Sequence, residues 1–353
     1  DGLTVAGNVS VDGGTIKLDG NYPVGTRNVA LGDNALGSVT SDGFNNIAIG
    51  DAALTTLTDS DNNVAIGRNA LTSATSATVN TSIGHETLTS LTTGDYNTAI
   101  GGQALNSNTT ASNNTAVGYQ AGYSNTTGYN NAAFGNQAFY YNTTGALNTA
   151  LGDSSLLANT TGSSNTAVGR SALGSNTTAS ENTAVGYQAG YANTTGAQLT
   201  ALGSNALDAN TTGTLNTGLG WRALTANTTA SSNTAVGAGA MEVNTTGANN
   251  TAAGEAALKF NTTGNSNTAV GYEALNQNSI GGDNVAVGFR ALDANTTGNG
   301  NVAIGLNALT DNTTASNNTA VGYLALDSNT TASNNTAVGM SALISNSTGS
   351  NNT

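Results

Sequence analysis

A glycine recurs at every seventeenth position along most of this chain, and this interval constrains the fold more than any other feature. From Gly50 to Gly339 the spacing never changes, and one earlier copy, Gly32, precedes Gly50 by a single position more than the repeat length. A spacing that tolerates no insertion is typical of repeat proteins, in which each unit stacks on the previous one in register. The sequence therefore predicts a stacked repeat architecture, in contrast to an enzyme, whose loops vary in length.

The 19 copies share the consensus N-T-A-V-G-x-x-A-L-x-x-N-T-T-G-x-x, and Asn stands four residues before the glycine in all but one copy, which has Leu199. N-T-A-V predicts a short strand with Thr and Val on one face and Ala on the other. The glycine suits a tight bend or a close backbone approach. A-L predicts a second short extended segment. N-T-T-G predicts a turn, because Asn and Gly tolerate positive φ. The Thr hydroxyls are expected to close local hydrogen bonds in this turn.

These elements predict an all-β fold, a parallel β-solenoid with one 17-residue coil per repeat. A helix is disfavoured because Asn, Thr and Gly dominate and the apolar residues lack helical spacing. The expected core of each coil is thin: the apolar residue before the glycine, the Leu and two alanines. In one coil these two bulky columns hold Phe134 and Phe139. We expect Asn ladders and packing in a homotrimer to add stability, although a single narrow solenoid remains the alternative.

Three regions are expected along the chain. Residues 1–27 contain short alternating apolar pairs separated by turn signals, which predict a leader of short β-strands. Residues 28–95 hold the first coils, whose turns are atypical because an apolar residue replaces the Asn of Asn-Thr-Thr. These apolar residues are Val39, Leu57, Ala74 and Leu91. Residues 96–353 form the regular array, and because the last repeat stops in mid-coil we expect the array to continue beyond the C-terminus.

The composition excludes several classes of partner. Only 8% of the residues are charged, and 20 acidic against 7 basic residues give a net charge of −13. A chain with this charge is not expected to bind nucleic acid or an anionic membrane. No apolar run is long enough to span a bilayer, so no membrane insertion is expected.

Residues that carry catalysis or bind metals are sparse. The chain has no cysteine, and its one histidine, His85, lies in a variable column. The acids Asp51, Asp153, Glu255 and Glu273 are scattered over variable columns without a fixed offset. General acid–base catalysis and metal binding both need several such groups together. The sequence therefore predicts no enzyme activity, no catalytic residue, no metal site and no cofactor.

Two surface features have more than one interpretation. The turn column contains Asn-Thr-Thr acceptor sequons, which are sites for N-linked glycans in secreted eukaryotic proteins. A ladder of stacked Asn side chains is favoured, because the strand Asn recurs without a sequon in every coil except that of Asn80. Aromatic residues in the column after the marker glycine are candidates for stacking on sugars, or are surface residues at a tolerant position. These candidate glycan contacts are Tyr119, Tyr187, Trp221, Tyr272, Phe289 and Tyr323.

The repeat motif resembles two families. N-N-I-A-I-G-D-A-A-L at residues 45–54 resembles the head repeats of trimeric autotransporter adhesins. N-T-A-V-G-Y-Q-A-G-Y-S-N-T-T-G at residues 114–128 is more similar to tail-fibre-like repeat proteins of phages, especially those infecting marine cyanobacteria, and residues 2–21 resemble a segment that introduces such arrays. The resemblance implies a homotrimeric, left-handed parallel β-roll in an appendage that meets a host surface.

Three functions follow as expectations. The leading one is the structural shaft of a viral tail fibre or a similar surface appendage, which positions a host-attachment tip and contacts other virion or appendage proteins. The second is an adhesin whose exposed aromatic residues bind host-surface glycans. The third is ice binding, because ranks of Thr at strand spacing resemble antifreeze solenoids, although Val shares the face with Thr here.

Overall fold

The computed structural model describes residues 27–39 and 43–353, and the predicted leader lies almost wholly outside them. The described residues form 19 strands of three residues each and no helix. The chain divides into two compact units, residues 1–119 and residues 120–353. The predicted all-β, parallel β-solenoid fold is confirmed in both units.

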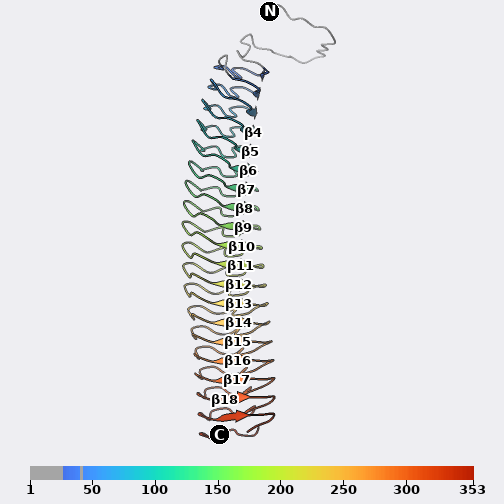
Figure 1. The fold of residues 1–353 in the computed structure, drawn as a ribbon, viewed down its shortest axis with the longest axis vertical. Helices are drawn as coiled ribbons and strands as arrows, with labels where there is room; N and C mark the ends of the chain where they lie inside the picture. Colours follow the sequence, from blue (N-terminus) through green and yellow to red (C-terminus); the bar gives the residue numbers. More distant parts are fainter. Residues whose placement is uncertain (1–26, 40–42) are drawn as a thin grey trace, which may run out of the picture. The chain divides into compact units, whose positions relative to one another are not determined.

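Within each unit, every strand pairs in parallel with the next strand along the chain, as the stacked arrows of Figure 1 show. The register joins equivalent repeat positions, so that Thr166 lies beside Thr183 and Val168 beside Val185. The strands of the first unit are β1 (Val29–Leu31), β2 (Ile47–Ile49), β3 (Val64–Ile66), β4 (Thr81–Ile83), β5 (Thr98–Ile100) and β6 (Thr115–Val117). The strands of the second unit are β7 (Ala132–Phe134), β8 (Thr149–Leu151), β9 (Thr166–Val168), β10 (Thr183–Val185), β11 (Thr200–Leu202), β12 (Thr217–Leu219), β13 (Thr234–Val236), β14 (Thr251–Ala253), β15 (Thr268–Val270), β16 (Val285–Val287), β17 (Val302–Ile304), β18 (Thr319–Val321) and β19 (Thr336–Val338).

The strand alternates as predicted, but the face that points inward is the Ala face. In β13 the central Ala235 is fully buried, whereas Val236 is 42% exposed. The prediction that the residue before the glycine belongs to the core is therefore wrong. Phe139 is buried and Phe134 is exposed, so only one of these two residues packs inside the coil. A coil this short has a narrow interior, and the inward position of the strand holds only small residues: Ala, Ser82 or Gly218.

The marker glycine meets both predicted requirements. Gly203 has a φ of +129°, in a region that residues with a side chain rarely adopt. A Cβ atom at Gly203 would lie only 2.5 Å from the carbonyl oxygen of Gly220 on the next coil. The bend and the close backbone approach therefore both require glycine, which explains why this column defines the repeat.

The predicted extended segment at A-L is wrong, because these residues form a turn. Asn205 and Leu207 have φ values of +57° and +53°, in the left-handed region. Holding a non-glycine residue there costs roughly 1–2 kcal/mol, whereas burying a Leu side chain contributes about 1.5–3 kcal/mol. The curled backbone directs Leu207, which is fully buried, into the interior. Tertiary burial thus outweighs the local preference.

The Asn-Thr-Thr-Gly turn also differs in detail from the prediction. Neither Asn210 nor Gly213 has a positive φ, and Leu215, just before the next strand Asn, has a φ of +59°. The Thr hydroxyls bond between coils instead of locally: the Thr160 hydroxyl donates to the Thr177 carbonyl oxygen at 3.0 Å. The column after Thr-Thr must be small because a Cβ atom at Gly213 would contact the backbone of the next coil.

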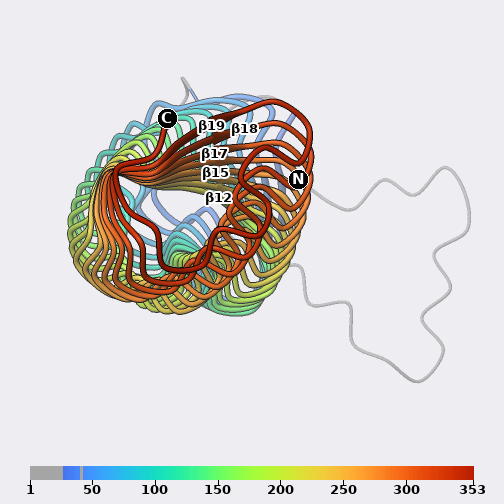
Figure 2. The ribbon, with the colours of Figure 1, turned by 90° about the horizontal axis from the view of Figure 1, so that it is seen from below.

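Two ladders of buried Asn side chains complete the interior. The strand Asn165 donates from Nδ2 to Asn148 Oδ1 at 3.1 Å and to the Ala179 carbonyl at 2.9 Å. The turn Asn159 donates from Nδ2 to Asn142 Oδ1 at 2.9 Å and to the Gly162 carbonyl at 3.0 Å. Figure 2, which looks along the stack, shows successive coils of each unit superimposed, as such ladders require. The predicted Asn ladder is confirmed, and it replaces much of the apolar core that a wider fold would have.

Candidate functional site

The six predicted aromatic residues all lie on the surface, and each is between 42% and 56% exposed. They share one position, directly after the marker glycine, where the chain has left the strand and turned. At this position about half of each side chain reaches solvent, so the solenoid tolerates large apolar residues there. Exposed apolar side chains in a contiguous group mark interaction surfaces, whereas single ones are ordinary. The grouping of these six residues therefore decides their significance.

In the second unit the structure brings some of these residues together. Tyr272 and Phe289 occupy successive coils and stack with ring centroids 5.3 Å apart and planes 15° apart. Tyr323 lies two coils beyond Phe289, with the exposed Leu306 between them. A hydrogen bond to the Glu273 carboxylate, followed by the negative charge of that group, raises the pKa of the Tyr272 hydroxyl. From Tyr272 to Tyr323, the column after the marker glycine thus holds an aromatic or Leu residue in each of four successive coils.

Tyr187 and Trp221 form a second arrangement, with one coil between them. The residue of that coil in the same column is Ser204, which is small and partly exposed. The Arg222 guanidinium lies over the Trp221 ring at 5.3 Å from its centroid. Tyr119 belongs to the first unit and has Gly102 before it in the column, so it is not part of an aromatic group there.

One aromatic cluster was missed by the sequence interpretation. Tyr123 and Tyr140 stack at 5.1 Å with planes 6° apart, and Tyr141 meets Tyr140 edge-on at 4.6 Å. These residues follow the Leu position, not the marker glycine. The signal was present in the sequence, because Tyr123 and Tyr140 are separated by one repeat length and every such pair becomes adjacent in the stack.

Charged side chains pair both within a coil and between neighbouring coils of the second unit. Glu242 accepts Arg222 Nη1 at 2.8 Å and Lys259 Nζ at 3.2 Å. Arg290 pairs with Asp293 at 2.7 Å and with Glu273 at 3.4 Å. Burial raises the pKa of Asp293, and the Arg290 guanidinium partly opposes that shift. The variable columns thus place opposite charges side by side, which sets the orientation of their side chains.

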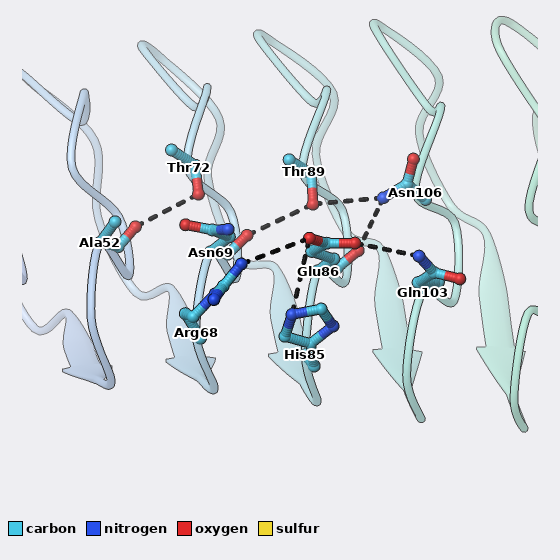
Figure 3. A network of polar contacts seen from close by, with 9 residues as sticks. All are labelled: Ala52, Arg68, Asn69, Thr72, His85, Glu86, Thr89, Gln103 and Asn106. Carbon is cyan, nitrogen blue, oxygen red and sulfur yellow. Dashed lines mark hydrogen bonds and ion pairs between the residues drawn. The ribbon is translucent and has the colours of Figure 1, made fainter.

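Burial likewise raises the pKa of Asp327, and the neighbouring Asp311 adds to that shift. In the first unit, Figure 3 shows His85 beside Glu86, with Nε2 3.5 Å from Oε1. Gln103 donates to Glu86 Oε2 at 2.9 Å, and this hydrogen bond is the main cause that lowers the pKa of Glu86. The histidine has a carboxylate neighbour and more than half of its side chain in solvent, as an ordinary surface residue does.

The asparagines of the turn-column sequons are interior residues over most of the array. From Asn108 to Asn329, every Asn of the turn column is fully buried. Their Nδ2 groups donate hydrogen bonds, as Asn176 does to Asn159 Oδ1 at 2.9 Å. An N-linked glycan replaces an Nδ2 hydrogen, and the folded coil has no space for it there. The ladder interpretation of this column is therefore confirmed.

Within residues 27–39 and 43–353, no group of three or more His, Cys, Asp or Glu side chains is placed to hold a metal ion. Those residues also contain no helix of the length and apolar character needed to cross a bilayer. The chain matches no protein-family model, and comparison with curated proteins gives no significant similarity.

Proposed function

We propose that this chain is the structural shaft of a viral tail fibre or a similar surface appendage, and that it positions a host-attachment tip. The observation that carries the proposal is which columns of the repeat keep the same residue type from coil to coil. The most regular inward columns lie inside the coil or at its bends, where Gly203, Ala235 and Asn165 set the geometry of stacking. The columns that follow the marker glycine and the Leu vary from coil to coil. A chain whose regular inward positions serve stacking is suited to setting a distance.

The outer face of the strands supports assembly as a homotrimer. On each of the 19 described strands the two outward residues are uncharged, and one of them is nearly always a branched or larger apolar residue. Examples are Leu151, Val236 and Ile304, each of which is at least 40% exposed. A row of one apolar side chain per coil matches the period of another copy of the same chain. Three copies in parallel would cover these rows and add the core that one coil lacks.

Removing whole coils tests the spacing role. Deletion of residues 251–284 takes out two complete repeats and joins Asn250 to Val285, so the register is kept. For a shaft, electron micrographs of the purified protein should show particles shorter by about 10 Å, two inter-strand steps. On the particle that carries the appendage, attachment to the host should be retained. A matched control deletes residues 251–276, which is not a whole number of coils and should misfold.

Loss of attachment after the two-coil deletion, with the shortened shaft intact, would contradict a spacing role and favour an adhesin. The observation that supports an adhesin as the second candidate is the grouping of exposed aromatic residues in the second unit, such as Tyr272 with Phe289. Ice binding has less support, because the outer strand face carries one Thr rank beside an apolar rank where two Thr ranks are needed. We expect the purified protein to show no thermal hysteresis.

A further inference from the structure

Two tyrosine rings of the second unit lie face to face on successive coils. Tyr123 and Tyr140 stack with ring centroids 5.1 Å apart and planes 6° apart. They are separated by one repeat length, and no other two tyrosines of the chain have this separation. The stack therefore brings two phenol groups together, whereas the stack of Tyr272 on Phe289 contains only one.

The backbone fixes this pair on both sides. Gly122 N donates to Ala138 O at 2.9 Å, and Ser124 N donates to Tyr140 O at 2.9 Å. The centroid separation is close to the inter-strand step of about 4.8 Å, so the two parallel rings are related nearly by a translation of one coil. Each atom of one ring therefore lies beside the same atom of the other, and the ring carbons next to the two hydroxyl groups are neighbours.

Solvent reaches the cluster of tyrosines. Tyr123 and Tyr140 are each partly exposed, and Tyr141, whose ring meets Tyr140 edge-on at 4.6 Å, is 53% exposed. An oxidant in solution therefore has access to these side chains. The contact between Tyr140 and Tyr141 differs in kind from the stack, because planes at 81° direct the edge of one ring at the face of the other.

We propose that Tyr123 and Tyr140 are the site of an intrachain dityrosine cross-link, formed when the protein meets hydrogen peroxide and a haem peroxidase. Each phenol loses one electron and its hydroxyl proton to the oxidant and becomes a phenoxyl radical. A carbon–carbon bond then forms between the ring carbons next to the two oxygens, and the hydrogens displaced from those carbons return to the oxygens. One hydrogen peroxide molecule takes up the two electrons and two protons and leaves as two water molecules.

Proximity favours this coupling over the coupling of other tyrosines. Two groups held in contact react as if each were present at a very high concentration, whereas tyrosines on separate molecules must meet by diffusion. The bond joins two successive coils and restricts the unfolded chain, as a disulfide does in other proteins. This chain has no cysteine to form a disulfide. The cross-link goes beyond the spacing role and does not depend on it.

Oxidation of the purified full chain tests the site. The chain is treated with a haem peroxidase and hydrogen peroxide, and dityrosine is followed by its fluorescence, excited where Tyr and Trp do not absorb. We expect a product that has lost two hydrogen atoms, migrates as a single 34.7 kDa chain on a denaturing gel and yields peptides in which Tyr123 is joined to Tyr140. An absence of dityrosine, or dityrosine found only in covalent dimers or between other tyrosines, would overturn the proposal.

Three variants separate this pair from general oxidation of tyrosine. Tyr123→Phe keeps the stacked rings but lacks one phenol, and it should abolish the intrachain dityrosine. The matched control Tyr141→Phe should form the cross-link as the parent does. Phe289→Tyr should gain a second cross-link, to Tyr272, because it places two phenols in the same kind of stack at 5.3 Å. Dityrosine that persists in Tyr123→Phe, that is lost equally in Tyr141→Phe, or that is not gained in Phe289→Tyr would refute the assignment.

Discussion

The first four coils and the coils of the second unit fill the same interior position with different chemistry. Leu57 in the first group and Asn159 in the second are both fully buried. The early coils vary at this position among Val, Leu and Ala, whereas every later coil has Asn. An apolar side chain is stabilised by burial alone, so its neighbours need not match it. A buried amide needs the amides of the adjacent coils, and this mutual need keeps the column uniform.

The largest expected effect lies in a feature that the two regions share. Gly50→Ala and Gly203→Ala would place a Cβ atom 2.6 Å and 2.5 Å from the carbonyl oxygen of the next marker glycine. Each should lower the free energy of unfolding by more than about 4 kcal/mol, because the obstacle is backbone that cannot move aside. Denaturant unfolding followed by circular dichroism, at equal protein concentration, measures both. If only one of the two substitutions lowered the free energy of unfolding, the two regions would differ in their glycine bends as well as in the turn column.

A substitution that interrupts the Asn ladder should have the next largest effect. Asn159→Leu removes the donor to Asn142 Oδ1 and the acceptor for Asn176 Nδ2. Leaving buried polar groups without partners costs about 1–3 kcal/mol for each group. We expect a loss of stability of about 2–4 kcal/mol, with protection of the Asn142 and Asn176 side-chain amides from hydrogen exchange reduced. Unchanged protection would show that the ladder is not cooperative.

The reverse exchange in the first unit sharpens the contrast. Leu57→Asn should destabilise by about 2–3 kcal/mol, because it loses apolar burial and gains an amide beside Val39 and Ala74. Replacing Leu57, Ala74 and Leu91 by Asn together should cost less than the sum of the three single changes, since the new amides bond to one another and to Asn108. Strict additivity in a comparison of the single and triple variants would argue against the ladder as a cooperative unit.

The smallest expected effect concerns the strand ladder, which has a single gap. Leu199 replaces the strand Asn, and its backbone N–H donates to Asn182 Oδ1 at 2.9 Å, but it offers no acceptor to Asn216. Leu199→Asn should stabilise the second unit by about 1 kcal/mol, the net contribution of a hydrogen bond. A rise in unfolding midpoint tests this. A fall would indicate that the packing of Leu199 outweighs the missing amide.

The repeat period was sufficient to predict the fold class, the strand position, the glycine bend and the Asn ladder. Each of these follows from a residue type with few structural alternatives, such as Gly203 at its close backbone contact. Two errors have a common cause. Val236 was expected inside and Leu207 was expected in an extended segment, because local patterns do not contain the width of the coil. The interior volume decides that Ala faces inward and that Leu turns in through a left-handed backbone.

The sequence predicted correctly that the six aromatic residues lie on the surface, but it did not predict which of them lie next to one another. Grouping depends on which coils are adjacent, and on what lies between, as Ser204 does between Tyr187 and Trp221. These relations can be read from positions one or two repeat lengths apart only once parallel, in-register stacking is established. The pairing of Glu242 with Arg222 and Lys259 has no fixed sequence offset, because it depends on side-chain reach across two columns.

The central claim is that copies of this chain assemble in parallel through the outer strand face. Sedimentation equilibrium tests it most directly. The account predicts a mass of about 104 kDa, three times the 34.7 kDa chain. Val168→Lys, Val185→Lys and Leu202→Lys together should give a folded species of 34.7 kDa. The matched control, with Lys at the exposed positions Thr178, Thr195 and Thr212 of the same three coils, should keep the larger mass. A parent chain that sediments as a monomer would contradict the account.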